Sequence, residues 1–414
     1  MNSIINNQII LARAPEGPLA THIGPFAGSL REQGYSLGSI HRQVLLAACF
    51  SRWLKQQGVA KRSLTSDHPP RYLRNRAQQV RPCRGDAAAL RHLLDFLRGE
   101  RVIPTEKKVS ARLLTPAERC AQAYEQHLRE ARGLARATII NYVPFIRSFL
   151  KDHFGSGLAT LSHLCARDVV GFVRRQAPRL HPKRAKLLTS ALRSFLQYAR
   201  YRGEVKLDLA AAVPIVANWS MSSIPRAIGT AAVRQLLASI DRRTAMGRRD
   251  YAILLLLARL GLRSGEVTFL ELDDIDRNVG QLSVRGKSGP RSDLPLPPEV
   301  GKAIAEYLRR GRPRCTSRRV FLRAKAPLCG FRGPGGVGSI VRHRLQRAGV
   351  VDAPTYGTHQ FRHGLATEML RQGASLDEIG EVLGHHHPQT TKIYTQVDLE
   401  ALRTLALPWP GGVR

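Results

Sequence analysis

The stretch 359–394 constrains the fold of this chain more than any other, because it contains the start and stop signals of consecutive short helices. Apolar residues recur every four positions from Phe361 to Met369, and this spacing predicts an amphipathic helix over 359–371. Gly373 suits the C-cap of that helix, since glycine tolerates the left-handed backbone that ends many helices. Residues 359–371 are therefore expected to form one well-defined helix.

Two more helices are expected after it. Ser375-Leu-Asp-Glu378 has the pattern of a capping box, which predicts a helix over 376–383. Pro388 suits the first turn of a third helix, which would contain Tyr394.

The charge of the chain indicates a polyanionic partner. The 414 residues, enough for two or three domains, include 65 Lys and Arg against 31 Asp and Glu, a formal charge of +34 spread along the whole length. Folded domains with such an excess usually bind nucleic acid. A membrane surface is the rival polyanion, but the sequence has no basic amphipathic anchor and no lipidation signal.

Nothing in the sequence indicates export or a membrane span, so we expect a cytoplasmic, nucleoid-associated protein. Residues 1–14 lack the pattern of a signal peptide, and the longest apolar run, 252–258, is too short to span a bilayer. The six cysteines are scattered without a CxxC pair, which favours reduced, mostly packed thiols over a zinc site or a disulfide framework.

The periodicities predict a mainly α fold with a small β-sheet, an α+β class. The expected organisation is a lead-in (1–17), an N-terminal helical DNA-binding module (18–106), a second helical module (114–206), a linker (207–225), a last domain (226–400) and a tail (401–414). Within the last domain we expect helices at 229–240, 248–260, 298–310 and 339–348, and two strands at 281–285 and 292–296.

The two helical modules resemble each other. Leu30-Arg-Glu-Gln-Gly34 matches Leu128-Arg-Glu-Ala-Arg-Gly133 with one insertion, and Phe50 matches Phe149. Further matches in the same order are Ser39-Ile40 with Thr138-Ile139 and Leu90-Arg-His-Leu-Leu-Asp-Phe with Leu192-Arg-Ser-Phe-Leu-Gln-Tyr. The pattern favours a tandem duplication, and chance similarity between two helical stretches is the alternative. Helix faces expected to be buried include Ile40, Val44, Leu45 and Ala48 in the first module and Ile139, Val143, Ile146 and Leu150 in the second.

Six side chains form a set suited to phosphoryl transfer without a metal: Arg263, Lys287, His359, Arg362, His385 and Tyr394. A tyrosine hydroxyl, with a pKa of about 10, becomes a useful nucleophile when cations surround the group it attacks and a neighbour takes its proton. Guanidinium groups match phosphate oxygens, and residues three apart on a helix can point at one phosphate. No cluster of carboxylates for Mg²⁺ accompanies the set, so neither a metal nor another cofactor is expected.

Residues 226–400 resemble the catalytic domain of the tyrosine recombinases, also called the phage integrase family. The resemblance rests on four blocks in order: Ala258-Arg-Leu-Gly-Leu-Arg263-Ser-Gly-Glu266-Val, Val284-Arg-Gly-Lys287-Ser-Gly, His359-x-x-Arg362-His-Gly-Leu-Ala-Thr367, and Leu383-Gly-His385 followed by Tyr394. It implies that Tyr394 attacks a DNA phosphodiester to form a 3′-phosphotyrosine, while Arg263 and Arg362 clamp the phosphate.

The same resemblance implies the other roles. Lys287 would be the general acid for the leaving 5′-oxygen, His359 would assist as general acid or base, and His385 would hydrogen-bond the phosphate. Glu266 would hold the site residues in position without contacting the phosphate itself. The covalent intermediate would conserve the bond energy, so neither ATP nor a metal ion would be needed.

Residues 114–206 resemble the core-binding domain of the family, a helical module that clamps DNA. Two features depart from the family plan: Gly364 stands where threonine is frequent, and the module 18–106 has no counterpart in the minimal plan. That module is either a duplicated core-binding domain or an arm-site binder.

Taken singly, each site residue has an ordinary explanation, such as a helix-end arginine or an exposed hairpin lysine, and the run from His385 to His387 resembles a metal tract. The shared order and spacing favour a catalytic site instead. We therefore expect a site-specific recombinase or integrase of a mobile genetic element, active in transposition. It would act on two double-stranded DNA sites as a homotetramer, alone or with a partner recombinase. No membrane is expected among its partners. A type IB topoisomerase-like nicking and resealing enzyme and a non-catalytic DNA-binding subunit are the alternatives.

Overall fold

The structure is a computed structural model that describes residues 3–5, 9–11, 13–104, 114–155, 157, 160–216, 227–286, 291–350, 357–384 and 391. The chain divides into two compact units: Met1–Glu106 together with Ile224–Arg414, and Lys107–Ser223. The expected N-terminal module and last domain therefore fall in one unit, although each has a hydrophobic core of its own.

The N-terminal segment contains more regular structure than the expected lead-in. β1 (Ser3–Ile5) and β2 (Ile9–Leu11) pair antiparallel, with Ser3 opposite Leu11. The helices that follow are α1 (Ala20–Glu32), α2 (Leu37–Gln56), the 3₁₀ turn η1 (Lys61–Ser63), α3 (His68–Ala77) and α4 (Asp86–Gly99). Three of the four residues expected on the buried face of α2 are buried, but Leu45 is 45% exposed. The buried stripe runs through Val44 and Ala47, so Leu45 faces solvent.

The second unit is also a helical bundle. Its elements are α5 (Pro116–Glu130), α6 (Arg136–Phe154), η2 (Leu161–His163), α7 (Ala166–Gln176), η3 (Ala177–Arg179) and α8 (Pro182–Tyr201). The predicted buried face of α6 is confirmed, because Ile139, Val143, Ile146 and Leu150 are all at most 5% exposed. Leu209, Ala210 and Val213 join the same core, so the expected linker begins with residues that pack on the bundle.

The C-terminal part has the predicted α+β composition. Its helices are α9 (Thr230–Ala238), α10 (Ala245–Arg259), α11 (Ser264–Phe269), α12 (Pro298–Arg310), α13 (Gly335–Arg347), α14 (His359–Arg371) and α15 (Leu376–Leu383), with the 3₁₀ turn η5 (Leu272–Asp274). β3 (Ile275–Asp276), β4 (Gln281–Arg285) and β5 (Arg291–Pro295) form an antiparallel sheet in that order. The two-residue β3 was not predicted, and α13 begins four residues before the expected 339.

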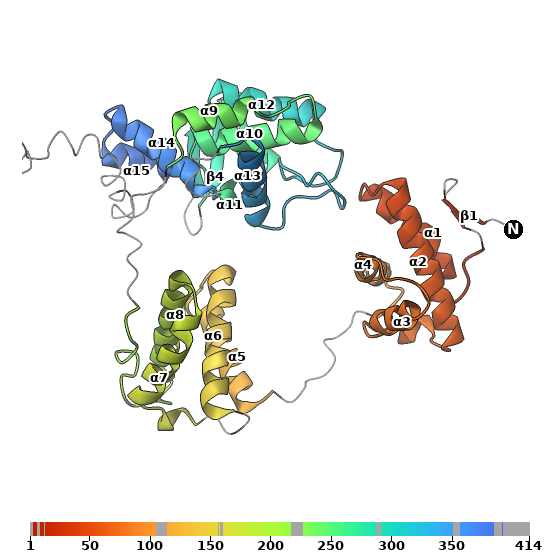
Figure 1. Ribbon diagram of the computed structural model, residues 1–414, viewed down its shortest axis with the longest axis horizontal. Coiled ribbons are helices and arrows are strands. Elements are labelled where there is room, and N and C mark those ends of the chain that lie inside the picture. The colour runs from red at the N-terminus through yellow and green to blue at the C-terminus, as the bar shows by residue number, and fades with distance from the viewer. Residues whose placement is uncertain are drawn as a thin grey trace, which may run out of the picture. The chain divides into compact units, whose positions relative to one another are not determined.

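α10 forms the centre of this core. Each of its residues from Ala252 to Leu257 is at most 1% exposed, and α12 and α14 pack on it. Figure 1 shows α14 and α15 together at one end of this helical group, beside α9 and α10. The central helix therefore sets the position of the loop that leaves its C-terminus.

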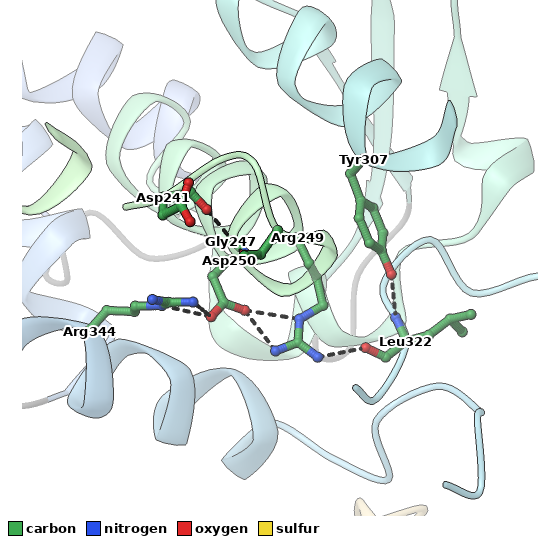
Figure 2. A network of polar contacts seen from close by, with 8 residues as sticks. Asp241, Gly247, Arg249, Asp250, Tyr307, Leu322 and Arg344 are labelled. Atoms are coloured by element: carbon green, nitrogen blue, oxygen red, sulfur yellow. Dashed lines mark hydrogen bonds and ion pairs between the residues drawn. The ribbon is translucent and has the colours of Figure 1, made fainter. Parts of the chain in front are cut away.

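A buried ion network joins α10 to α13 (Figure 2). The carboxylate of Asp250, 3% exposed, accepts from Nε and Nη2 of Arg249 at 2.9 and 2.7 Å and from Nε of Arg344 at 2.7 Å. Nη1 of Arg249 also donates to the carbonyl of Leu322 at 2.9 Å. The network ties the helix to two segments that are far from it in sequence.

Within the described ranges, no helix is long and apolar enough to cross a membrane. All six cysteines lie in the described residues as free thiols, four of them half-buried and two, Cys83 and Cys165, exposed.

Candidate active site

The turn after α10 depends on Gly261. Its backbone is left-handed (φ +57°), and a Cβ there would lie 2.8 Å from the side chain of Leu383 and 3.1 Å from that of Leu365. The left-handed backbone therefore favours glycine, and any larger residue would also displace the ends of the Leu383 and Leu365 side chains. The turn brings Arg263 to the start of α11, next to α14 and α15.

Glu266 fixes Arg263 through two contacts. Its carboxylate accepts the backbone N–H of Arg263 at 2.7 Å and Nη1 of the same residue at 2.7 Å. The Glu266 side chain is only 6% exposed, whereas that of Arg263 is 34% exposed. A buried carboxylate thus orients a guanidinium that still reaches solvent.

Arg362 is held by backbone carbonyls. It is 5% exposed, and its Nη1 donates to the carbonyl of Gly261 at 2.9 Å while its Nη2 donates to the carbonyl of Leu383. Nη2 of Arg263 donates to the adjacent carbonyl, that of Gly384, at 3.3 Å. The two arginines therefore converge on the C-terminal end of α15.

This convergence also locates the chain just before His385. α15 ends at Gly384, whose left-handed backbone (φ +60°) forms the C-cap, and His385 is the next residue. The last carbonyls of the helix, those of Leu383 and Gly384, therefore lie at the two guanidinium groups.

Two of the three helices predicted for this region are confirmed. α14 spans His359–Arg371, and Gly373 (φ +89°) lies one residue beyond its C-cap, Gln372. α15 opens with the predicted capping box, in which the hydroxyl of Ser375 accepts the N–H of Glu378 at 3.2 Å.

His359 lies at the first position of α14, and its ring centroid is 6.5 Å from that of His363. Burial lowers the pKa of His363, and the nearby His359 and Arg362 lower this pKa further. A neutral His363 is therefore favoured beside the arginine.

Thr391 lies three residues before Tyr394 and packs on α15. It is 3% exposed, and its Oγ1 lies 3.1 Å from the place that a Cβ on Gly380 would occupy. The small residue at 380 therefore leaves room for the side chain of Thr391 against the helix.

Gly364 has a local explanation. A Cβ at this position would lie 2.7 Å from the carbonyl oxygen of Ile228, and the N–H of Ile228 donates to the carbonyl of Gln360 at 3.2 Å. The segment before α9 lies so close to α14 that this chain has no room for the threonine frequent elsewhere in the family.

The described residues bring together four of the seven predicted site residues: Arg263, Glu266, His359 and Arg362, all on α11, on α14 or next to them. Lys287, His385 and Tyr394 lie outside the described residues, as does the helix expected near Pro388. β4 and β5, which flank the segment that contains Lys287, are formed as predicted. In the described part of the chain, no group of three or more His, Cys, Asp or Glu side chains is arranged to hold a metal ion.

Sequence patterns did not identify the carbonyls of Gly261, Leu383 and Gly384 as part of the site. Every residue has a carbonyl, so only the folded backbone shows which ones accept from the arginines. The glycines at 261 and 384 were the available signal.

Comparisons with known proteins identify the family of this chain. Residues 227–400 match the model of the phage integrase family, and residues 121–203 match the phage integrase N-terminal SAM-like domain. The chain is 60% identical over 411 residues to y4rA of Sinorhizobium fredii (strain NBRC 101917 / NGR234), whose name describes an integrase/recombinase; the match covers 99% of each chain. It is 30% identical to the tyrosine recombinase XerD of Listeria monocytogenes serotype 4b (strain F2365), over 64% of this chain and 90% of XerD.

A solved structure shares the fold. The post-cleavage complex of the XerH site-specific recombinase superposes with a TM-score of 0.56 at 19% identity, over 69% of this chain and 83% of XerH. The chain belongs to the phage integrase family, the tyrosine recombinases, which cut and rejoin DNA strands. This membership supports the predicted recombinase or integrase over the topoisomerase-like and non-catalytic alternatives.

Proposed function

We propose that Tyr394 is the nucleophile of a strand-exchange reaction at the site built around Arg263 and Arg362. The observation that supports this most is the convergence of both guanidinium groups on the carbonyls of Leu383 and Gly384, immediately before His385. A phosphodiester bound there would meet two fixed positive charges next to the segment that leads to Tyr394.

The proposed chemistry is an in-line displacement in two steps. The Tyr394 oxygen attacks phosphorus, the bond to the 5′-oxygen breaks, and Lys287 gives that oxygen a proton while His359 takes the phenolic proton. A 5′-hydroxyl of the other DNA then attacks the 3′-phosphotyrosine and releases Tyr394. The energy of the phosphodiester is kept throughout, so the reaction needs no external energy source.

The arginines would act by electrostatic stabilisation. Their positions are set by protein groups before DNA binds, so little reorganisation is needed as charge builds on the non-bridging oxygens. Arg362 is held by the carbonyls of Gly261 and Leu383, and Arg263 by Glu266 and one carbonyl. His385 would add a hydrogen bond to the same phosphate.

We assign the substrate as two double-stranded DNA sites, bound by a homotetramer with or without a partner recombinase, in the movement of a mobile element. XerH was solved with a palindromic DNA substrate, and the charge of +34 fits a DNA ligand here. The substrate implies work in the cytoplasm, on nucleoid DNA. In this proposal, 114–206 is the core-binding domain and 226–400 the catalytic domain.

A suicide duplex tests the proposal. Candidate duplexes from the DNA flanking the gene carry a nick, so that a short leaving fragment diffuses away after cleavage. Purified protein is incubated with them in EDTA and run on a denaturing gel, with Tyr394→Phe beside wild type. We expect a covalent protein–DNA band in wild type alone. Tight binding without a band on any duplex would contradict the proposal.

A further inference from the structure

The N-terminal module and the core-binding module have the same order of elements. α1, α2, η1, α3 and α4 follow one another as α5, α6, η2, α7 and α8 do, and η3 is the single addition in the second module. α2 begins 99 residues before α6, η1 begins 100 before η2, and α3 begins 98 before α7. The spacing between successive elements is therefore nearly the same in the two modules, from the second helix to the third.

The buried positions also correspond. Residues at most 5% exposed in both modules pair at offsets of 98 to 102: Ile23 with Ala121, Phe26 with Tyr124, Leu30 with Leu128, Ile40 with Ile139, Val44 with Val143, Phe50 with Phe149, Leu64 with Leu164, Tyr72 with Phe172, Leu90 with Leu192, Leu93 with Phe195, Leu94 with Leu196, Leu97 with Ala199 and Ile103 with Val205. Chance similarity between two helical stretches does not produce one core in the same order.

Two aromatic contacts are repeated with similar geometry. The rings of Phe26 and Phe96 lie 5.6 Å apart at 47°, and those of their counterparts, Tyr124 and Tyr198, lie 5.5 Å apart at 50°. Phe50 and Tyr72 lie 5.2 Å apart, and Phe149 and Phe172 lie 5.1 Å apart. The first pair joins α1 to α4 and the second joins α2 to α3, so the helices pack in equivalent ways.

The backbone carries a further match after the last helix. Arg101 (φ +55°) is the one non-glycine residue with positive φ in the described chain, and the residue 102 positions later is Gly203 (φ +71°). The unusual conformation of Arg101 follows from the shared turn rather than from its own side chain.

The third helix of the N-terminal module and the turn after it form a basic surface, which we call the α3 surface. It consists of Arg71, Arg74, Arg81 and Arg84, all exposed, and no acidic residue lies between Asp67 and Asp86. The corresponding region of the other module is also basic, with Arg174 on α7, Arg179 on η3, and Lys183 and Arg184 at the start of α8 all exposed.

An ion pair fixes the turn. Asp86, 8% exposed, accepts from Nη1 of Arg76 at 2.7 Å and from the N–H of Cys83 at 3.3 Å. Of the two acids that flank the surface, Asp67 is exposed at the start of α3, and Asp86 is buried and paired with Arg76, while Arg81 and Arg84 remain exposed on the turn.

We propose that residues 18–104 are a second copy of the core-binding fold and bind duplex DNA phosphates through the α3 surface. The enzyme then contacts more DNA than its core-binding and catalytic domains cover. This inference rests on the proposed function in one respect, because it takes DNA as the polyanion that the surface binds.

The test measures how DNA affinity depends on salt, in the full-length chain. All proteins carry Tyr394→Phe, so that no covalent product forms and the outcome is independent of the cleavage assay. Arg71→Gln, Arg74→Gln and Arg81→Gln are combined in one variant. The control combines Arg31→Gln, Lys55→Gln and Arg91→Gln, which remove the same charge from other exposed parts of the module. Binding to a long labelled duplex is followed by fluorescence anisotropy at several salt concentrations, and circular dichroism confirms that each variant is folded.

Each phosphate contact contributes about 0.9 to the slope of log affinity against log salt. We expect the slope of the α3 variant to fall by about 2 to 3 and its affinity at low salt to drop at least about tenfold, with a slope change below about 1 in the control. Equal changes in both variants, or an unchanged α3 variant, would overturn the proposal. A loss of self-association with an unchanged slope would instead assign the surface to protein contacts, and would overturn it as well.

Discussion

At the scale of single residues, the site depends on the arginines and also on the atoms that hold them in position. Gly261 contributes twice, because its carbonyl accepts from Arg362 and its bare Cα leaves room for Leu383. Such a position is sensitive to a single methyl group even though it never touches DNA in the proposed mechanism.

Gly261→Ala should disturb the site. The new Cβ would meet Leu383 in a backbone conformation that alanine rarely adopts, so we expect a loss of about 1–3 kcal/mol in unfolding free energy. Cleavage of the suicide duplex should fall at least about tenfold, because the displaced turn carries Arg263. Gly280→Ala is the matched control: Gly280 has the same type of backbone (φ +67°) but open space around it. Equal loss of cleavage in both variants would show that the contact with Leu383 is irrelevant.

Gly380→Ala separates stability from activity. Alanine in a helix is ordinarily stabilising relative to glycine by about 0.5–1 kcal/mol. The added methyl group would press on Thr391, so the chain leading to Tyr394 must shift, and we expect slower cleavage at unchanged DNA affinity and unchanged or higher melting temperature. Gly338→Ala, in a helix with open space, is the control. A wild-type cleavage rate in the Gly380→Ala variant would contradict the proposed importance of the contact between Thr391 and Gly380.

The lowered pKa of His363 predicts that the stability of the protein depends on pH. Its pKa is lowered in the folded state, chiefly by burial, so the folded protein binds fewer protons here than the unfolded chain. This contribution to stability is complete above the ordinary histidine pKa of about 6.5 and is lost as the pH falls below it. Denaturant unfolding at pH 7.5 and 5.5 should show a smaller decrease for His363→Gln than for wild type. A decrease of the same size in both would exclude His363 as its source.

At the scale of elements, the buried network of Figure 2 connects α13 to α10, the helix that precedes the turn to Arg263. Asp250 bonds to both Arg249 and Arg344, and all three are under 10% exposed. Removing one partner of a buried ion pair leaves charge without compensation, which costs more than the pair itself contributes.

Asp250→Ala should therefore destabilise the C-terminal domain by about 3–5 kcal/mol, measured by urea unfolding. Asp273→Ala removes an exposed acid that pairs with Arg318 and should change stability by at most about 0.5 kcal/mol. A similar small effect for both would mean that the buried arginines find other acceptors.

The elements also show what the sequence could predict. α12, α14 and α15 begin and end at the predicted residues, because capping signals and periodicity are local. Glu266 beside Arg263 was expected from the family motif. The ion network of Asp250, the exposed Leu45 and the close approach of Ile228 to Gly364 were not predicted, because each depends on which segments meet in three dimensions.

At the scale of the whole molecule, a strand-exchange enzyme must both bind DNA and assemble on it, and these requirements can be tested separately. The charge of +34 is spread over the chain, so no single segment should account for binding. The tail lies outside the described residues, and its sequence repeats leucine at Leu399, Leu402 and Leu405, the spacing of an apolar helix face. We infer that this face packs against a neighbouring subunit.

Deletion of 399–414 should then weaken assembly and leave DNA affinity nearly intact. The deleted segment contains two arginines of the 65 basic residues, so single-site binding in a mobility-shift assay should stay within about threefold of wild type. Recombination between two sites on a plasmid should fall strongly, because occupied sites no longer associate, whereas cleavage of a suicide duplex should fall less. Deleting 411–414 keeps the leucines and serves as the control. Undiminished recombination by the longer deletion would remove the tail from the assembly and would leave the other surfaces of the catalytic domain as the source of subunit contacts.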